Sequence, residues 1–188
     1  HDNLGDLHDK LDQGLDSDLM ITSAGVSKGD YDVVKNALSE RGKINFWSVR
    51  MRPAKPLAWG MLEGVKGKFV PHLGLPGNPV SALVAFEEFA RPAILKMLGR
   101  KNLSKPTIKA KLKSPIINPD GRRVLARVLV TKENGVYFAE ATGPQGSNIM
   151  MSLVHANGLA VCPEDTDKMD VGETVSVKML DWNEEIEV

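Results

Sequence analysis

Three short segments of this 188-residue chain combine residue types suited to binding an anion. The first, residues 23–30, reads Ser-Ala-Gly-Val-Ser-Lys-Gly-Asp and joins a short apolar run to a helical pattern. Small residues in such a loop let the backbone approach a ligand closely, and its amide N–H groups can point at an anion. The alternative is an ordinary loop in which Asp30 only caps the following helix, and this loop taken alone favours that alternative.

The second candidate segment is the turn Leu-Gly-Leu-Pro-Gly-Asn-Pro at residues 73–79, which again follows an apolar run and opens a helical pattern. Asn78 is suited to the N-cap position and Pro79 to the first helical position, where a missing N–H costs nothing. Ser81 is expected to expose its hydroxyl at the start of that helix. The turn alone could simply end a strand, but two such loops in one domain favour a shared anion site.

The third segment, residues 50–56, reads Arg-Met-Arg-Pro-Ala-Lys-Pro and places three cationic side chains within six residues. Two prolines stiffen the segment, and its guanidinium and ammonium groups are suited to phosphate or another oxyanion. A solvated basic turn is the usual alternative for so short a run of charge. The neighbouring glycine-containing loops favour the functional interpretation.

Other kinds of site receive less support. The four histidines have no metal-ligand spacing, and the single cysteine, Cys162, is expected in the core. Arg122, Arg123 and Arg127 could bind phosphate, but in a β-rich segment they are expected to lie on a solvated face.

Composition limits the class of protein. The 24 basic and 24 acidic side chains give a formal net charge of zero. This argues against an overall basic surface of the kind that binds nucleic acid. Hydrophobic residues make up 42% of the chain and charged residues 26%, so a folded core is expected. No apolar run approaches the roughly 18 residues of a membrane span, and one cysteine fits a reducing compartment. We therefore expect a cytoplasmic protein with no nucleic-acid or membrane partner.

The first half of the chain must supply the strands and helices that position these segments. Its apolar runs alternate with helical patterns, which is typical of a layered α/β domain with a largely parallel sheet. In open α/β sheets, ligands bind at the carboxyl ends of strands, where the loops would lie. Strands are expected at residues 18–23, 43–51, 57–62 and 69–75, and helices at residues 2–15, 31–41 and 79–98.

After about residue 101 the pattern changes to short strands separated by turns. Residues 102–106 form a polar connector that contains proline, and Asp-Gly or Asn-Gly pairs mark three turns. Regularly spaced short strands indicate a small all-β sandwich or barrel. The predicted domains are therefore residues 1–102 and 103–188. Strands of the second are expected at residues 107–113, 123–131, 136–141, 159–163 and 174–179.

Three sequence blocks resemble the signature blocks of the MoeA/gephyrin family of molybdopterin molybdenumtransferases. They are Ser-Ala-Gly-Val-Ser-Lys-Gly-Asp-Tyr-Asp at residues 23–32, Met-Arg-Pro-Ala-Lys-Pro at 51–56 and Gly-Leu-Pro-Gly-Asn-Pro-Val-Ser-Ala at 74–82. The resemblance continues through Gly-Pro-Gln-Gly-Ser-Asn at 143–148 and Val-Gly-Glu at 171–173, so it covers nearly the whole chain. It implies a molybdopterin-binding α/β domain followed by a small β-barrel domain.

The resemblance also implies a reaction. Adenylylated molybdopterin and molybdate would be the substrates, AMP would be released, and molybdenum would remain on the dithiolene. Mg²⁺ is the expected metal, because it can bridge carboxylate and phosphate oxygens. The implied catalytic residues are Asp30, Arg52 and Lys55, and the implied metal ligands are Asp30 and Asp2. The implied residues that bind the pterin nucleotide come from the two glycine-containing loops: Ser23, Gly25, Ser27, Gly29, Gly74, Pro76, Gly77, Asn78 and Ser81.

The sequence departs from the family pattern at three positions. Ala24 stands where the family usually has the first glycine of a pair, and Ala54 where it has the glycine between proline and lysine. Both changes narrow the backbone freedom at positions where φ could need to be positive. Ser48 stands at a position that is lysine in some relatives, so no cation is expected there.

Full-length members of the family carry two further N-terminal domains and an earlier part of the α/β domain, so a C-terminal fragment is expected here. In the full-length form, a homodimer and contact with a molybdopterin adenylyltransferase are expected. A non-catalytic pterin-binding module or gephyrin-like scaffold is the alternative to the enzyme. A stand-alone adenylyltransferase is disfavoured, because it would not need residues 103–188. The loops do not distinguish molybdate from tungstate, since both are tetrahedral dianions of nearly equal size.

Overall fold

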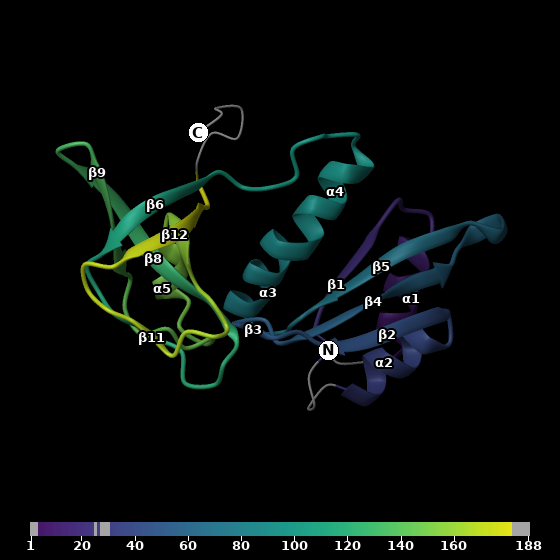
Figure 1. The fold of residues 1–188 in the computed structure, drawn as a ribbon. Coiled ribbons are helices and arrows are strands. Elements are labelled where there is room, and N and C mark those ends of the chain that lie inside the picture. Colours follow the sequence, from purple (N-terminus) through teal and green to yellow (C-terminus); the bar gives the residue numbers. More distant parts are fainter. Residues whose placement is uncertain (1–3, 25, 27–30, 182–188) are drawn as a thin grey trace. The chain divides into compact units, whose positions relative to one another are not determined.

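The structure is a computed structural model, and it describes residues 4–24, 26 and 31–181. The chain divides into two compact units. One consists of residues 1–49 and 54–90, and the other of residues 50–53 and 91–188 (Figure 1). Five predicted site residues lie outside the described residues: Asp2, Gly25, Ser27, Gly29 and Asp30.

The first unit is built on a four-stranded sheet with the strand order β1-β5-β4-β2 (Figure 1). Its helices begin where the sequence places helical patterns. The strands are β1 (Met20–Ser23), β2 (Gly42–Ser48), β4 (Pro56–Glu63) and β5 (Phe69–Leu75), and the helices are α1 (Leu4–Gly14), α2 (Tyr31–Ser39), α3 (Pro79–Ala85) and the short 3-10 turn η1 (Val65–Gly67).

The core of this unit lies between the sheet and helices α1 and α2. Leu11 of α1 and Leu38 of α2 are buried in one cluster with Leu62 of β4 and Val70 of β5. Leu7 and Leu11 lie on one face of α1, and Leu15 just after its end packs against the same cluster, so α1 presents a single apolar stripe. Burial of this stripe holds α1 against the face of the sheet. The carboxyl ends of β1 and β5 are followed by the two candidate loops.

The sheet is mixed, and the prediction of a largely parallel sheet was wrong. Only the β1–β5 pairing is parallel, whereas β4–β5 and β2–β4 are antiparallel. A parallel neighbour requires a crossover of a dozen or more residues, and the connections 64–68 and 49–55 are shorter than that. Residues 24–68 provide the long crossover between β1 and β5.

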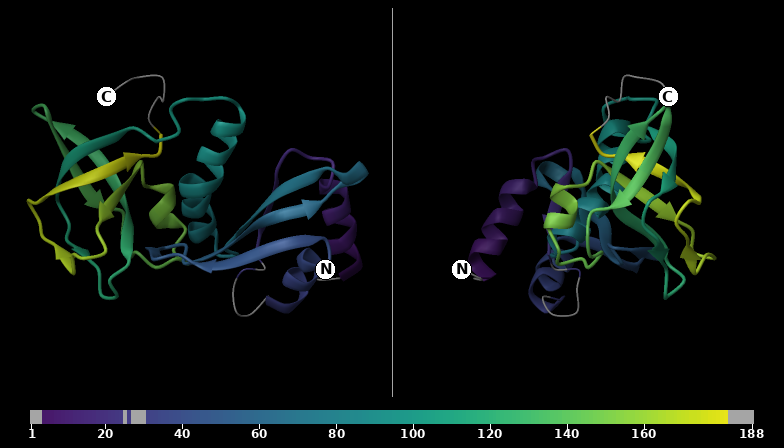
Figure 2. Two further views of the ribbon diagram at one scale, coloured as in Figure 1. Left: turned by 45° about the vertical axis from the view of Figure 1, so that its right-hand side comes forward. Right: turned by 90° about the vertical axis from the view of Figure 1, so that its left-hand side faces the viewer.

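The second unit is a five-stranded barrel with two short additions (Figure 2, green and yellow strands). Its strands follow the order β10-β12-β6-β9-β8, and β8 pairs back with β10 to close the barrel. The five strands are β6 (Thr107–Leu112), β8 (Arg123–Glu133), β9 (Val136–Ala141), β10 (Gly158–Cys162) and β12 (Thr174–Met179).

Further elements join the barrel at its edges. The two-residue strand β3 (Met51–Arg52) runs parallel to the start of β8, so residues 50–53 belong to this unit. The barrel core consists of inward side chains such as Ala126, Val128 and Val177, and it includes Cys162 as expected. The remaining elements are β7 (Ile116–Ile117), β11 (Lys168–Met169), α4 (Arg91–Met97) and α5 (Met151–Val154), while the π-helical turn η2 (Phe86–Ala90) links α3 to α4. Among the described residues, no helix combines the length and apolar character needed to cross a bilayer.

Candidate functional site

Parallel pairing of β1 with β5 brings two of the predicted segments together. Ser23, the last residue of β1, is the register partner of Leu75, the last residue of β5. Both strands therefore end at the same edge of the sheet, and the loops that follow them start side by side. The prediction of two adjacent strand-to-helix loops depends on this one pairing.

Direct contacts join the two loops beyond the ends of the strands. The Ala24 amide donates to the carbonyl oxygen of Leu75 at 3.1 Å, and the Ser23 hydroxyl donates to the carbonyl oxygen of Pro76 at 3.5 Å. A Cβ added to Gly77 would lie 3.3 Å from the Ala24 Cβ, so the backbones approach closely at that point. Gly77 thus allows the second loop to lie against the first.

Ala24 occupies a backbone conformation that favours glycine. Its φ is 89°, in the region where a Cβ is disfavoured. Ala54 in the basic segment has the same character, with a φ of 75°. Ala24 and Ala54 are the two positions at which the sequence departs from a family glycine. At both of them the backbone has a positive φ. The surrounding contacts hold each alanine in that conformation.

The start of α3 differs in part from the expectation. Asn78 occupies the N-cap position and Pro79 the first helical position, but the Asn78 side chain makes no capping hydrogen bond. Its Oδ1 is buried without a partner in the described part of the structure. The expectation of an exposed Ser81 hydroxyl was wrong, because Ser81 is only 7% exposed. The first turn of α3 packs this residue inward with Val80, which is fully buried.

One polar pair at this edge was not identified from the sequence. Nε2 of His72 on β5 lies 3.0 Å from Oγ1 of Thr22 on β1. His72 is 2% exposed, and burial lowers its pKa from 6.5 to about 4. The only sequence signal was a histidine in an otherwise apolar strand, and pairing with a threonine 50 residues away requires the three-dimensional register.

The basic segment is divided between the two units. Residues 50–53 belong to the barrel unit, while Lys55 belongs to the sheet unit and is exposed. The Val49 amide donates to the Lys55 carbonyl oxygen at 2.7 Å, which closes the base of the segment. In the barrel unit, the Arg50 guanidinium donates to the Gly121 carbonyl oxygen at 2.9 Å. Arg50 is therefore committed to structure, while the side chains of Arg52 and Lys55 have no hydrogen bond or ion pair among the described residues.

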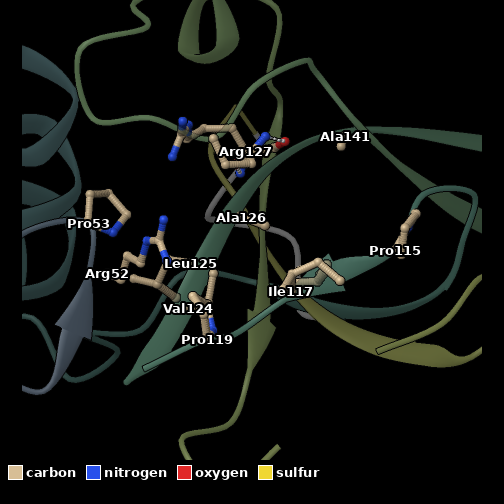
Figure 3. A pocket seen from close by; sticks show the side chains of 12 residues that line it. Arg52, Pro53, Pro115, Ile117, Pro119, Val124, Leu125, Ala126, Arg127 and Ala141 are labelled. Carbon is tan, nitrogen blue, oxygen red and sulfur yellow. Dashed lines mark hydrogen bonds between the residues drawn. The ribbon is translucent and has the colours of Figure 1, made fainter. Parts of the chain in front are cut away.

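Arg52 lines a cavity of about 280 Å³ within the barrel unit. In the view of Figure 3, Arg52 and Arg127 lie on one side of this cavity, and Pro115 and Ile117 lie on the other. Within the described parts of the chain, neither guanidinium forms an ion pair with a carboxylate. Burial lowers the pKa of Arg127, and the positive charge of Arg52 lowers it further. The cavity thus combines two cationic groups with apolar walls.

Arg127 contradicts the expectation of a solvated face, because it is only 1% exposed. Arg122 and Arg123 do form ion pairs near the surface, with Asp120 and Glu164 respectively. Arg123 and Arg127 point to the same side of β8 by strand alternation, so alternation alone predicts exposure for both. The difference arises because residues 142–153 cover β8 at Arg127.

The covering segment is held by Arg127 itself. Its Nε donates to the Ser152 hydroxyl at 3.0 Å, and its guanidinium donates to the Gly146 carbonyl oxygen at 3.0 Å. The Arg127 amide donates to Oε1 of Gln145 at 2.8 Å, while Nε2 of Gln145 donates to the Gly143 carbonyl oxygen at 2.9 Å. One buried side chain and its own backbone therefore organise the Gly-Pro-Gln-Gly-Ser-Asn block.

The predicted Mg²⁺ ligands, Asp2 and Asp30, lie outside the described residues. Among the residues that the structure does describe, no group of three or more histidine, cysteine, aspartate or glutamate side chains could hold a metal ion. Binding of Mg²⁺ by this chain accordingly stays a prediction.

Comparison with protein families identifies both parts of the chain. Residues 1–96 match the family described as "Probable molybdopterin binding domain", and residues 109–180 match "MoeA C-terminal region (domain IV)". The chain belongs to the MoeA family. This family is one of molybdenum cofactor biosynthesis, and its members' β-barrel domain corresponds to the closed barrel described above.

Several MoeA-family proteins are similar to this chain. It is 35% identical over 167 residues to the molybdopterin molybdenumtransferase of Haemophilus influenzae, a match covering 86% of this chain and 39% of that protein. It is 37% identical over 169 residues to molybdopterin molybdenumtransferase 2 of Mycobacterium tuberculosis, covering 87% and 40% respectively. Gephyrin of Dictyostelium discoideum is 33% identical over 199 residues, covering 95% and 28%.

A solved structure shows the same fold. The molybdopterin biosynthesis MoeA protein of Pyrococcus horikoshii matches 96% of this chain and 42% of its own, with a TM-score of 0.74 and 27% identity. The chain spans about two fifths of the length of the first two molybdenumtransferases it matches.

Proposed function

We propose that this MoeA-family protein acts as a molybdopterin molybdenumtransferase, which inserts molybdate into adenylylated molybdopterin with release of AMP. The observation that carries the proposal is the parallel β1–β5 pairing, which places residues 23–24 beside residues 75–77. Two amide-rich loops at one strand edge can hold phosphoanhydride oxygens without adding charge. The names of the similar proteins from Haemophilus influenzae and Mycobacterium tuberculosis support the same reaction.

The oxyanion substrate is suited to the cationic groups of the basic segment. Molybdate is a dianion, and Arg52 and Lys55 supply positive charge from a segment stiffened by proline. In the barrel cavity, the buried Arg127 guanidinium donates to neutral oxygens of Ser152 and Gly146 and has no carboxylate partner among the described residues, so its positive charge favours an anionic ligand nearby. The cavity thus supports binding of an oxyanion by Arg52 with Arg127.

Mg²⁺ would supply charge neutralisation between a carboxylate and the phosphate of the nucleotide. Asp30 and Asp2 are the residues proposed to hold it. Asp30→Asn should reduce Mg²⁺-dependent AMP release, and an unchanged release would remove Asp30 from this role.

The test is to combine the protein with adenylylated molybdopterin and molybdate under anaerobic conditions and to measure AMP by chromatography. Turnover that requires molybdate supports the proposal. Arg52→Gln should raise the molybdate concentration needed for half-maximal release, whereas Arg123→Gln, a surface arginine paired with Glu164, should not. Absence of both turnover and pterin binding would refute the assignment.

A pterin-binding or scaffold module is the second candidate, favoured by the similarity to gephyrin of Dictyostelium discoideum. Molybdopterin binding without AMP release would support it over the enzyme. We further propose a cytoplasmic protein that forms a homodimer in its full-length form and contacts a molybdopterin adenylyltransferase.

A further inference from the structure

His72 and Thr22 join the two strands that carry the candidate loops. The hydrogen bond between His72 Nε2 and Thr22 Oγ1 is 3.0 Å long, and it links β5 to β1 across 50 residues of sequence. Thr22 immediately precedes Ser23, the last residue of β1, and His72 lies three residues before Leu75, the last residue of β5. The pair therefore lies inside the parallel ladder, close to its last two register pairs, Thr22–Gly74 and Ser23–Leu75.

An imidazole at this position requires space that a neighbouring glycine, Gly74, provides. The register partner of His72 on β4 is Gly60, which has no side chain on that face. Gly74 is the next residue of β5 on the same face, and a Cβ there would lie 3.3 Å from Cε1 of His72. A larger residue at Gly74 would compete with the ring for the same volume, whereas a Cβ at Gly60 would meet Lys43 and Ile44 of β2.

Burying the His72 ring costs free energy, and packing alone does not account for a histidine at this position. His72 is 2% exposed, and its Nδ1 has no hydrogen-bond partner in the described structure. A buried nitrogen without a partner is unfavourable, and an apolar side chain would fill the same space without this cost. The hydrogen bond to Thr22 is the interaction that an apolar side chain could not supply.

The hydrogen bond between His72 and Thr22 also bears on Ala24, the first residue after β1. One residue beyond Ser23, Ala24 holds a φ of 89° while its amide donates to the Leu75 carbonyl oxygen. A non-glycine residue keeps such a conformation only where its surroundings determine it strongly. Separation of β1 from β5 at Thr22 would also release the Ala24 amide, because its bond to Leu75 lies just beyond the last register pair, Ser23–Leu75.

We propose that His72 and Thr22 are positioning residues that hold the end of β1 against β5 and thereby keep Ala24 and residues 75–77 in a binding-competent arrangement. For the identity of the ligand, this inference rests on the proposed function. The positioning role itself concerns only the described strands and is tested separately from the ligand.

Three variants of the chain test the proposal. Thr22→Val keeps the shape of the side chain but removes the hydroxyl, whereas Thr22→Ser keeps the hydroxyl. Val70→Ala is the control for general destabilisation, because Val70 is a fully buried residue of the same β5 strand with no hydrogen-bonding side chain. Amide hydrogen exchange is followed residue by residue, and affinity for molybdopterin is measured for each variant.

In Thr22→Val, exchange at the Ala24 amide should accelerate about tenfold relative to the amides of the β4–β5 ladder, the effect of losing one hydrogen bond. Affinity for molybdopterin should fall by a similar factor. Thr22→Ser should retain wild-type values for both, and Val70→Ala should change Ala24 and ladder amides together. The proposal would be overturned if the Ala24 amide exchanged at the same rate in Thr22→Val as in the wild type. It would also be overturned if Thr22→Val and Thr22→Ser accelerated that exchange equally. If the wild-type protein binds no molybdopterin, the proposed function fails, while the exchange rates still decide the positioning role.

Discussion

At the scale of single residues, Ala24 shows how the loop backbone tolerates an unfavourable side chain. A positive φ costs an L-residue about 1 kcal/mol, and glycine avoids this cost. Ala24→Gly should therefore raise the free energy of unfolding by up to about 1 kcal/mol, reduced by the greater freedom of glycine in the unfolded chain. Urea denaturation measures the difference.

A matched control for this substitution lies in the same unit. Ala37 is a buried residue within α2, where the backbone is helical, so Ala37→Gly should lower stability by about 1 kcal/mol. Effects of the same sign at Ala24 and Ala37 would contradict the conformational explanation.

His72 gives a second prediction, in the pH dependence of stability. Its pKa is lowered from 6.5 to about 4 in the folded protein, because burial disfavours the charged ring. Between these two values the unfolded chain binds the proton and the folded chain does not, so the free energy of unfolding falls as the pH is lowered from 6.5 to about 4. The loss attributable to His72 over this range is about 3 kcal/mol.

His72→Leu should flatten this part of the stability profile, as measured by denaturation at several pH values. His155→Leu, at an exposed histidine, serves as the comparison. A profile for His72→Leu parallel to that of the wild type would show that acid destabilisation has another source.

At the scale of elements, the barrel strand β8 depends on a segment that lies outside the barrel. Arg127 binds Ser152 and Gly146 through a planar guanidinium, and a lysine cannot reproduce that fork. Because hydrogen bonds to charged groups contribute about 1.5–3 kcal/mol each, Arg127→Lys should lower the free energy of unfolding by about 2 kcal/mol. Calorimetry of the variant gives the value.

The matched variant is Arg123→Lys, in the same strand and near the surface. Its ion pair with Glu164 is exposed to solvent, so its substitution should leave stability nearly unchanged. Equal losses for Arg123→Lys and Arg127→Lys would contradict the importance of the covering segment.

At the scale of the whole molecule, each unit has its own core. The barrel core cluster is drawn entirely from residues 108–179, and its closure by β8 and β10 does not involve β3. A chain of residues 91–188 should therefore unfold cooperatively, which circular dichroism and calorimetry would show. Because this shorter chain lacks Arg52, it should bind molybdate more weakly than residues 1–188. A shorter chain without a cooperative transition would show that the barrel depends on residues before 91, β3 among them.

Much of the local structure was predictable from short-range patterns. The strand expected at residues 69–75 coincides with β5, and the helix starting at Pro79 follows its N-cap and proline signals. The expected strands at 136–141 and 174–179 coincide with β9 and β12. Alternation, caps and turn residues are set by neighbours within a few positions, so a single sequence contains them.

Residue types and spacing indicate which loops are rich in small residues, where two alanines stand in place of glycine, and where β5, β9 and β12 end. The strand expected at residues 43–51 was wrong at its end, because β2 stops at Ser48 and Met51 belongs to β3 of the other unit. The mixed sheet, the burial of Arg127 and Ser81, and the pairing of His72 with Thr22 follow from the folded structure and were not predicted. The physical reason is the same in each case. Which strand lies beside β5, and which segment covers β8, depend on contacts between residues far apart in the chain, and no local periodicity specifies those contacts.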